Sequence, residues 1–191
     1  MKIRTFLLAM LCFLTAPLVS AHAHTAHEHG AAKLTIAVDG AKVSIGLESP
    51  LDNLLGFEHA PTTPDQRKRV KDMAVRMHQA EKLFQLTPAA ECRLESVRLS
   101  SEKLDPALLD PKMPLEPAPA GSGAGKKAAK EEHGDLDADF LFICAKPADL
   151  NSVEVLLFTA WPGMKKIDAR AVTPKGQRAA GLSAKKRTIS W

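Results

Sequence analysis

The stretch KLTIAVDGAKVSIGLE (33–48) carries the clearest structural signal in the chain. In each half, apolar residues alternate with polar or small ones, and Asp39-Gly40 lies between the two halves. Alternation with a period of two predicts a strand with one buried face, and an Asp-Gly pair suits a tight turn that needs a positive φ. The stretch therefore predicts a β-hairpin that presents one apolar face to a core.

The segment before this hairpin has the features of a secretory signal. Two basic residues precede an apolar run of about ten residues, and small residues follow at the spacing of a cleavage site. The run is shorter than the roughly 20 apolar residues that span a bilayer. We therefore expect residues 1–21 to be a signal peptide, cleaved after Ala21 or Ala23. The mature chain would lie in the periplasm and would not be embedded in the membrane.

The composition of the remaining chain excludes a nucleic-acid partner and favours one domain. Removal of Lys2 and Arg4 reduces the 26 Lys and Arg residues to 24, against 22 Asp and Glu. This near-balance gives no electrostatic case for nucleic acid, and no nucleic-acid motif is present. About 170 residues remain, the length of one domain, which we place at 33–191. An even pair of cysteines in an exported chain, Cys92 and Cys144, favours a disulfide over two buried thiols.

The region after the hairpin predicts a helix. The segment SPLDNLLGFEHAP (49–61) is rich in turn formers yet apolar, so we expect it to lie against the sheet. Thr63-Pro64-Asp65-Gln66 then combines a capping threonine, a proline suited to the first helical position and a capping-box glutamine. Apolar residues at spacings of three and four predict one amphipathic helix over 64–85. Its opposite face is basic and carries Arg67, Lys68 and Lys71.

The second half of the chain reads mainly as strands. ECRLESVRL (91–99) alternates as a strand does, whereas 100–135 is rich in proline and glycine and predicts a long flexible insertion. Nearly continuous apolar runs at 139–145 and 152–160 indicate strands buried on both faces. Weaker strands are expected at 166–173 and in the C-terminal segment.

These elements together predict an α+β domain. We expect a mostly antiparallel, sandwich-like β-sheet with one amphipathic helix and one long insertion. A disulfide between Cys92 and Cys144 would join strands on either side of the insertion.

Metal-ligand chemistry is the strongest chemical signal in the chain. No G-x-S-x-G, H-E-x-x-H or phosphate-binding glycine loop is present in the sequence, and we expect no enzymatic activity. Four of the seven histidines instead lie within one histidine-rich segment, 22–32, at His22, His24, His27 and His29. Neutral imidazole is a common ligand for zinc and also suits copper and nickel. In an extended chain His27 and His29 project to the same side and can bind one ion. The alternative is a solvated N-terminus that binds metal weakly.

The cleavage position decides one further binding mode. Cleavage after Ala21 leaves a terminus of His22-Ala23-His24, which can hold Cu(II) or Ni(II) in a square plane through its amine, backbone nitrogens and His24. Cleavage after Ala23 abolishes this mode.

Two histidines elsewhere are further candidates for metal ligands. His59 lies in the apolar segment GFEHAP, where the alternative is a half-buried, hydrogen-bonded side chain. His133 lies among carboxylates in EEHGDLDAD (131–139), where the alternative is a solvated acidic patch. His78 lies on the predicted helix, and we expect it to be structural or to face solvent.

Four segments of the chain, running from about residue 27 to the C-terminus, resemble the ZrgA family of periplasmic zinc-binding proteins. They are HEHGAAKLTIAVDG (27–40), ESPLDNLLGFEHAPTTPDQ (48–66), DADFLFIC (137–144) and LLFTAWPGMKKI (156–167). The resemblance implies export, regulation by zinc, and a role in supplying zinc alongside an ABC-type zinc importer. It also implies zinc ligands at His27, His29, His59 and His133. Family members often carry several histidines in the insertion, whereas this chain has only His133, which argues against high-capacity binding there.

The sequence therefore predicts a periplasmic zinc-binding protein that acts as a metallochaperone or buffer in zinc uptake. A single Zn²⁺ site would be built from the N-terminal histidines, His59 and His133, since three or four imidazoles suit tetrahedral zinc. Two alternatives remain: a copper or nickel binder that uses His22-Ala23-His24, and a metal-independent protein that docks a transporter through its strands and basic helix face.

Overall fold

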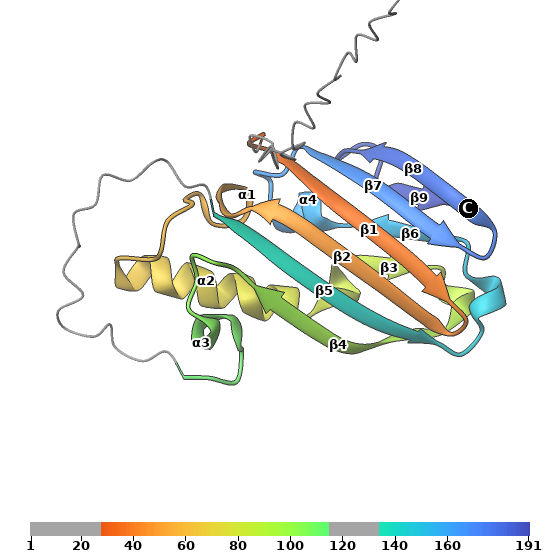
Figure 1. The fold of residues 1–191 in the computed structure, drawn as a ribbon, viewed down its shortest axis with the longest axis horizontal. Helices are drawn as coiled ribbons and strands as arrows, with labels where there is room; N and C mark the ends of the chain where they lie inside the picture. The colour runs from red at the N-terminus through yellow and green to blue at the C-terminus, as the bar shows by residue number, and fades with distance from the viewer. Residues whose placement is uncertain (1–27, 115–133) are drawn as a thin grey trace, which may run out of the picture.

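The computed structural model describes residues 28–114 and 134–191 and consists of two β-sheets with short helices. The strand order is β4-β5-β2-β1-β7-β8 in the large sheet and β3-β6-β9 in the small one. The large sheet faces the viewer in Figure 1, with the small sheet and helix α2 behind it. This is the sandwich-like α+β architecture that the sequence predicts.

The elements have the following bounds. The large sheet contains β1 (Ala31–Asp39), β2 (Lys42–Pro50), β4 (Cys92–Ser100), β5 (Asp135–Cys144), β7 (Lys166–Thr173) and β8 (Gly176–Leu182). The small sheet contains β3 (Phe84–Leu86), β6 (Ser152–Val155) and β9 (Thr188–Ser190). The α-helices are α1 (Leu51–Leu55), α2 (Pro64–Met77), α3 (Pro106–Leu109) and α4 (Leu157–Ala160). Within the two described ranges, none of the helices is long and apolar enough for a membrane span.

The predicted hairpin is confirmed at the centre of the large sheet. Strands β1 and β2 pair antiparallel from Lys33↔Glu48 to Asp39↔Lys42. Gly40 opens the two-residue turn with a φ of +54°, a backbone conformation that glycine adopts without a steric penalty. All other ladders are also antiparallel, except that β1 and β7 run parallel.

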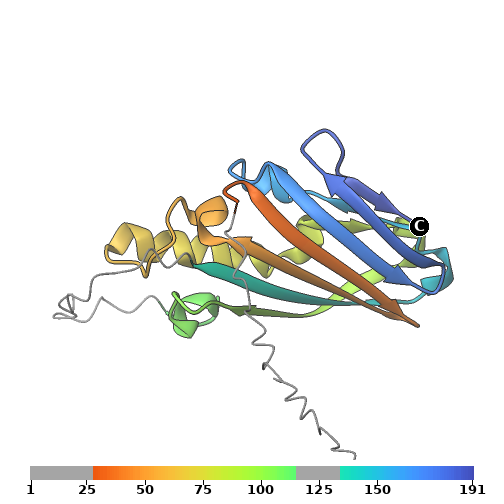
Figure 2. The same cartoon turned by 45° about the horizontal axis from the view of Figure 1, so that its top comes forward.

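The core lies between the large sheet and the layer behind it, as Figure 2 shows. The inward row of the hairpin is almost fully buried: Leu34, Ile36, Val43, Ile45 and Leu47. Helix α2 contributes Val70, Met73, Ala74 and Met77 from its apolar face. Burial of each large aliphatic side chain contributes about 1.5–3 kcal/mol, so this interface holds the two layers together.

The predicted helix over 64–85 begins where expected but ends early. Thr63 and Gln66 form the predicted capping box at the start of α2. The helix ends at Met77, and Phe84 lies in β3, opposite Val155 of β6. Pairing with β6 gives the backbone of β3 hydrogen-bond partners, and this tertiary gain overrides the helical spacing of the apolar residues.

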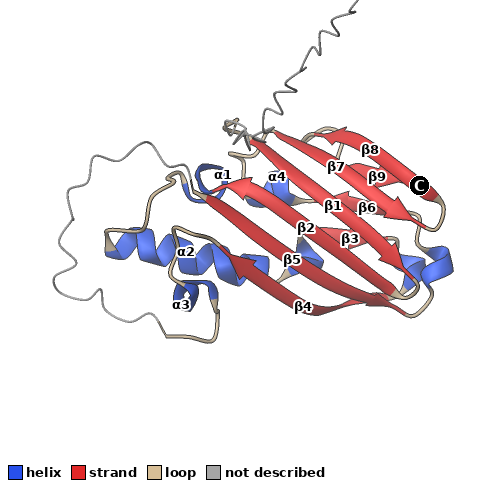
Figure 3. Cartoon of the chain, in the orientation of Figure 1, coloured by secondary structure: helices blue, strands red, loops and turns tan. Residues whose placement is uncertain are grey.

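The segment expected to lie against the sheet does so: it forms α1, which buries Leu51, Leu54 and Leu55. Two other expectations were wrong in detail. Strand β5 is buried on one face only, because its other face lies on the open side of the large sheet. The run at 152–160 is divided into the short strand β6 and helix α4. Figure 3 shows these helices around one end and behind the strands.

The first part of the predicted flexible insertion is packed. Leu104, Leu108 and Leu109 are buried around α3. The ammonium group of Lys71 on α2 donates to the backbone carbonyls of Ala107 and Asp110. One residue of the basic helix face therefore holds α3 in place, and residues 115–133 lie outside the described ranges.

The predicted disulfide joins Cys92 of β4 to Cys144 of β5. The two residues are directly opposite each other in the antiparallel ladder, and the bond closes a loop across a sequence separation of 52 residues.

Replacement of both cysteines by serine is expected to lower the free energy of unfolding by about 4 kcal/mol, the chain-entropy value for a loop of this length. Urea denaturation of the variant and of the oxidised protein would measure the difference. An unchanged midpoint would show that the crosslink does not constrain the unfolded chain.

Candidate metal centre

The buried side chain of Asn53 organises the end of the sheet where β1 begins. Its Oδ1 atom accepts a hydrogen bond from the Gly30 amide at 2.6 Å. Its Nδ2 atom donates to the Ala31 carbonyl at 2.8 Å and to Ser49 Oγ at 3.2 Å. One side chain of α1 therefore fixes the path of the chain just after His29.

Gly30 is the second fixed point of this path. Its φ is +87°, and a Cβ atom there would lie 3.1 Å from Lys165 Cγ, so the position suits glycine. Its carbonyl accepts hydrogen bonds from the amides of Lys165 and Lys166 at 2.7 and 2.9 Å. The start of β1 is thus held between α1 and β7, and His29 projects beside α1.

His29 is exposed and is paired with carboxylates. Its Nδ1 atom lies 3.0 Å from Asp52 Oδ2 and 3.9 Å from Glu58 Oε1. The hydrogen bond to Asp52, followed by the negative charge of Glu58, raises the pKa of His29 above its ordinary value of 6.5. Because a carboxylate only accepts, the Nδ1 atom donates, and in the neutral ring Nε2 carries the lone pair. Metal-ligating histidines are commonly oriented by a carboxylate in this way.

His59 has a comparable arrangement. Its Nδ1 atom lies 2.8 Å from the Ala60 carbonyl oxygen, which again places the ring hydrogen on Nδ1 and the lone pair on Nε2. The ring stacks on Phe57 with centroids 5.2 Å apart, and the side chain is exposed. Stacking and the hydrogen bond together restrict the orientation of this imidazole.

Glu58 connects the two histidines and the end of the insertion. It lies 3.9 Å from His29 and directly precedes His59 in the chain. A Cβ atom on Gly134 would lie 2.5 Å from the Glu58 carbonyl oxygen, and the Gly134 carbonyl accepts a hydrogen bond from the Leu51 amide at 2.8 Å. Three segments that are far apart in sequence, at residues 29, 58–59 and 134, therefore meet at α1.

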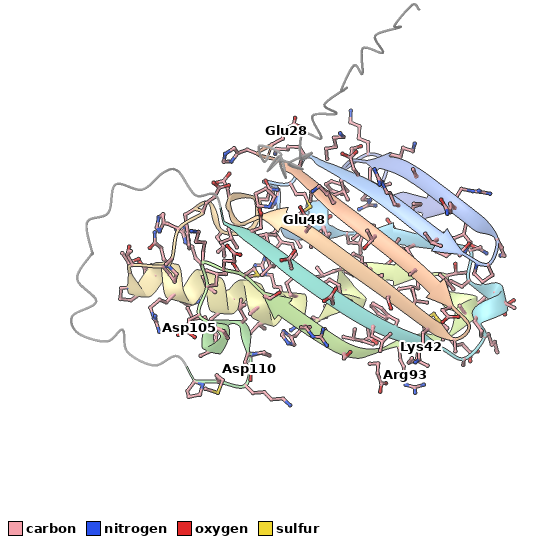
Figure 4. The ribbon with its side chains drawn as sticks, viewed as in Figure 1. Glu28, Lys42, Glu48, Arg93, Asp105 and Asp110 are labelled. Atoms are coloured by element: carbon pink, nitrogen blue, oxygen red, sulfur yellow. A yellow bond between two sulfur atoms is a disulfide. The ribbon has the colours of Figure 1, made fainter. Side chains whose placement is uncertain are left out.

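Carboxylates and cations are interleaved on the open face of the sheet beside this site. Glu48 and Asp137 are opposite each other in the β2–β5 ladder. Burial, followed by the charges of Glu48 and Asp139, raises the pKa of Asp137. Lys33 forms an ion pair with Glu48 at 2.6 Å. Figure 4 shows Glu48 and Glu28 toward the same end of the molecule.

The other predicted ligands have different outcomes. His22, His24, His27 and His133 lie outside the described residues. Within the described ranges no three His, Cys, Asp or Glu side chains are grouped closely enough to hold a metal ion. His78 is half-buried and its Nδ1 atom lies 3.0 Å from the Ala74 carbonyl oxygen, in agreement with the structural role expected for it.

Sequence reasoning missed the residues that position the histidines. Asp52, Asn53 and Glu58 lie in the same short segment as His59, DNLLGFEH, but no periodicity marks them as partners of His29. The available signal was the density of polar residues in an otherwise apolar segment. Polar side chains there need partners when the segment is packed.

The fold and the site define a class of protein: an α+β sandwich that presents two imidazoles, each hydrogen-bonded to an oxygen acceptor, near the carboxylates of Asp52 and Glu58. This donor chemistry suits a divalent transition metal ion. No curated protein matches the chain. A family model described as ZrgA family zinc uptake protein matches residues 26–191. The chain therefore belongs to the ZrgA family of zinc uptake proteins, which confirms the resemblance seen in the sequence.

Replacement of Gly134 by alanine is expected to destabilise the protein by about 1–3 kcal/mol, because the added Cβ meets the Glu58 backbone. Gly181→Ala is the matched control, since its Cβ would meet no atom within 4 Å. Thermal or urea unfolding of both variants would test this. Equal stabilities would contradict the close packing of Gly134 on residue 58.

Replacement of Asp52 by asparagine is expected to lower the pKa of His29 toward its ordinary value, because the hydrogen bond to Asp52 is the main cause of the raised pKa. NMR titration of the histidine rings would measure the shift, with His78 as an internal reference. In the unaltered protein the raised pKa stabilises the fold below pH 6.5, and this contribution is lost as the pH rises through the pKa of folded His29. A His29 pKa that does not change in the variant would rule out this pairing in solution.

Proposed function

We propose that this chain is a periplasmic zinc-binding protein that acts as a metallochaperone or buffer in zinc uptake, with His29 and His59 among its ligands. The observation that carries the proposal is the pairing of the exposed His29 imidazole with the carboxylates of Asp52 and Glu58, directly before a second exposed imidazole, His59. In both rings Nδ1 is held by an oxygen acceptor, at 3.0 Å in His29 and 2.8 Å in His59. In the neutral ring this leaves the Nε2 lone pair for a metal ion.

The remaining ligands proposed are the other histidines of the sequence analysis. His27 is two residues before His29, and His133 directly precedes Gly134, which packs against Glu58. His22 and His24 extend the N-terminal set. Zinc favours four ligands in a tetrahedral arrangement. The contacts of Glu58, which directly precedes His59, with His29 and with the position of Gly134 support one shared site. Zinc is the cargo of this site, and the proposed role is carriage without catalysis.

Protonation provides a route for release of zinc. A zinc ligand must be a neutral imidazole, so protons compete with the metal. The pKa of His29 is raised by Asp52 and Glu58, so this ring becomes protonated at a higher pH than an ordinary histidine. Zinc affinity is therefore expected to decrease as the pH falls through the pKa of His29.

Export and a transporter partner belong to the same proposal. The disulfide between Cys92 and Cys144 is typical of proteins that fold in an oxidising compartment such as the periplasm. Membership of a zinc uptake family supports an acceptor in the uptake system, for which an ABC-type zinc importer is the proposed candidate.

The experiment that tests the proposal is a competition titration of the exported protein with Zn²⁺ against chelators of known affinity. Mutation of a group that orients a metal ligand lowers metal affinity by about tenfold or more, and removal of the ligand itself should cost at least as much. A variant with His29→Ala and His59→Ala is therefore expected to lose at least about tenfold in zinc affinity. The titration would be repeated at several pH values, and the variant should show the shallower dependence.

His78→Ala is the matched control for this titration. Its imidazole also places Nδ1 on a backbone carbonyl, at 3.0 Å, but lies at the other end of α2. Separate variants at His133 and at the three histidines before His29 would assign the remaining ligands. Zinc affinity that is unchanged in the His29/His59 variant would refute the site, and tight copper binding that depends on His24 would favour the rival metal.

A further inference from the structure

A cavity lies at the C-terminal end of α2, in the layer behind the large sheet. Its volume is about 420 Å³, within the range of sites that bind small ligands or anchoring side chains. Leu83, Leu156 and Ala160 supply its apolar surface, and the cationic side chains around it are Arg76, Lys82 and Arg187. An apolar hollow with a cationic rim is suited to an anionic partner that carries an apolar group.

The walls of this pocket are held by backbone hydrogen bonds. The Leu156 amide donates to the Leu83 carbonyl at 2.8 Å, which joins the segments that follow α2 and β6. The Val155 amide donates to the Arg187 carbonyl at 2.9 Å, which adds the residue before β9. The pocket is therefore preformed, and a ligand would not need to order it.

The cations at the rim are positioned mainly by neutral groups. Arg76 Nη1 donates to the Ala160 carbonyl at 3.0 Å, and Lys82 Nζ donates to Gln79 Oε1 at 3.0 Å. Arg187 forms an ion pair with Glu154 at 3.0 Å. In the described part of the chain no Asp or Glu lines the cavity itself, so the charges of Arg76 and Lys82 are not neutralised there by a lining carboxylate.

We propose that this pocket is a docking site for an acidic segment of a partner protein. An apolar side chain of the partner enters the hollow between Leu83 and Leu156, and flanking carboxylates contact Arg76 and Lys82. Charge complementarity supports this occupant, because the cations at the rim attract carboxylates and repel a basic partner. The site is separated from the metal centre by α2, whose 14 residues span about 21 Å. The pocket therefore shares no residue with the proposed zinc ligands.

The test uses two capped synthetic peptides with the same central leucine and phenylalanine, one flanked by glutamates and the other by lysines. Binding to the zinc-free protein would be followed by NMR shifts of backbone amides. The acidic peptide is expected to bind and to shift the signals of Leu83, Leu156 and Ala160. Its affinity should fall by at least about tenfold in the double variant Arg76→Glu/Lys82→Glu, and should weaken as salt is added.

Two controls keep the result specific. Arg93→Glu reverses a cation on the edge strand β4, away from the pocket, and should leave binding unchanged (Figure 4). Lys82 Nζ donates to the Gln79 side chain. The single variant Lys82→Glu removes this hydrogen bond and tests the role of charge if the double variant does not fold. A peptide with serines in place of leucine and phenylalanine should not bind.

Evidence that the pocket binds something other than an acidic segment would overturn the proposal. Equal binding of the acidic and basic peptides would exclude charge selection. Self-association of the chain in sedimentation experiments that Lys82→Glu abolishes would make the surface a contact between copies. Binding of dodecanoate but of neither peptide would make it a site for a small amphiphile. Failure of the zinc titration would leave this proposal unaffected, since the peptides are tested without metal.

Discussion

The hydrogen bonds of the buried Asn53 side chain are the constraint on which the end of the molecule that carries His29 depends. The amide uses its oxygen and both hydrogens of its nitrogen, in bonds to Gly30, Ala31 and Ser49. A buried amide that lacks such partners costs about 1–3 kcal/mol, so α1 and the start of β1 keep their relative position. The Gly30 carbonyl also accepts hydrogen bonds from the amides of Lys165 and Lys166, at the start of β7. Contacts with α1 and β7 therefore fix the backbone at the start of β1, next to His29. The carboxylates of Asp52 and Glu58 then have a defined imidazole to contact.

Much of the fold could be predicted because burial on one face leaves a periodic trace in the sequence. The central hairpin, the start of α2 at its capping box, β4, β7 and the Cys92–Cys144 pair were all predicted from local patterns. The errors occurred where distant pairing decides the outcome. Phe84 has helical spacing from Met77 and Ala80, yet it lies in β3 because β6 is available beside it. Leu141 and Ile143 belong to an apolar run but lie on the open face of β5, which local composition does not reveal.

The sequence named candidate ligands but not their surroundings. His29 and His59 are two of the six histidines predicted to bind metal, and metal binding by them stays a prediction. The roles of Asp52 and Glu58 depend on contacts across 23 and 29 residues of sequence, which no local spacing encodes. The packing of Gly134 on residue 58 is also a consequence of the β2–β5 ladder, which brings the end of the insertion to α1. Topology, more than motif, therefore brings these segments together.

The distribution of charge separates the two proposed binding functions along the molecule. Asp52 and Glu58 border the histidines at one end of α2, whereas Arg76 and Lys82 border the apolar pocket at the other. An acidic partner is attracted by the second end and repelled by the carboxylates of the first, so docking would not block the imidazoles electrostatically. Conversely, a divalent cation is favoured beside Asp52 and Glu58 and disfavoured beside the three cations of the pocket. A carrier that must hold its cargo while it contacts an acceptor needs this kind of separation, because one surface cannot be optimised for both a metal cation and an anionic protein.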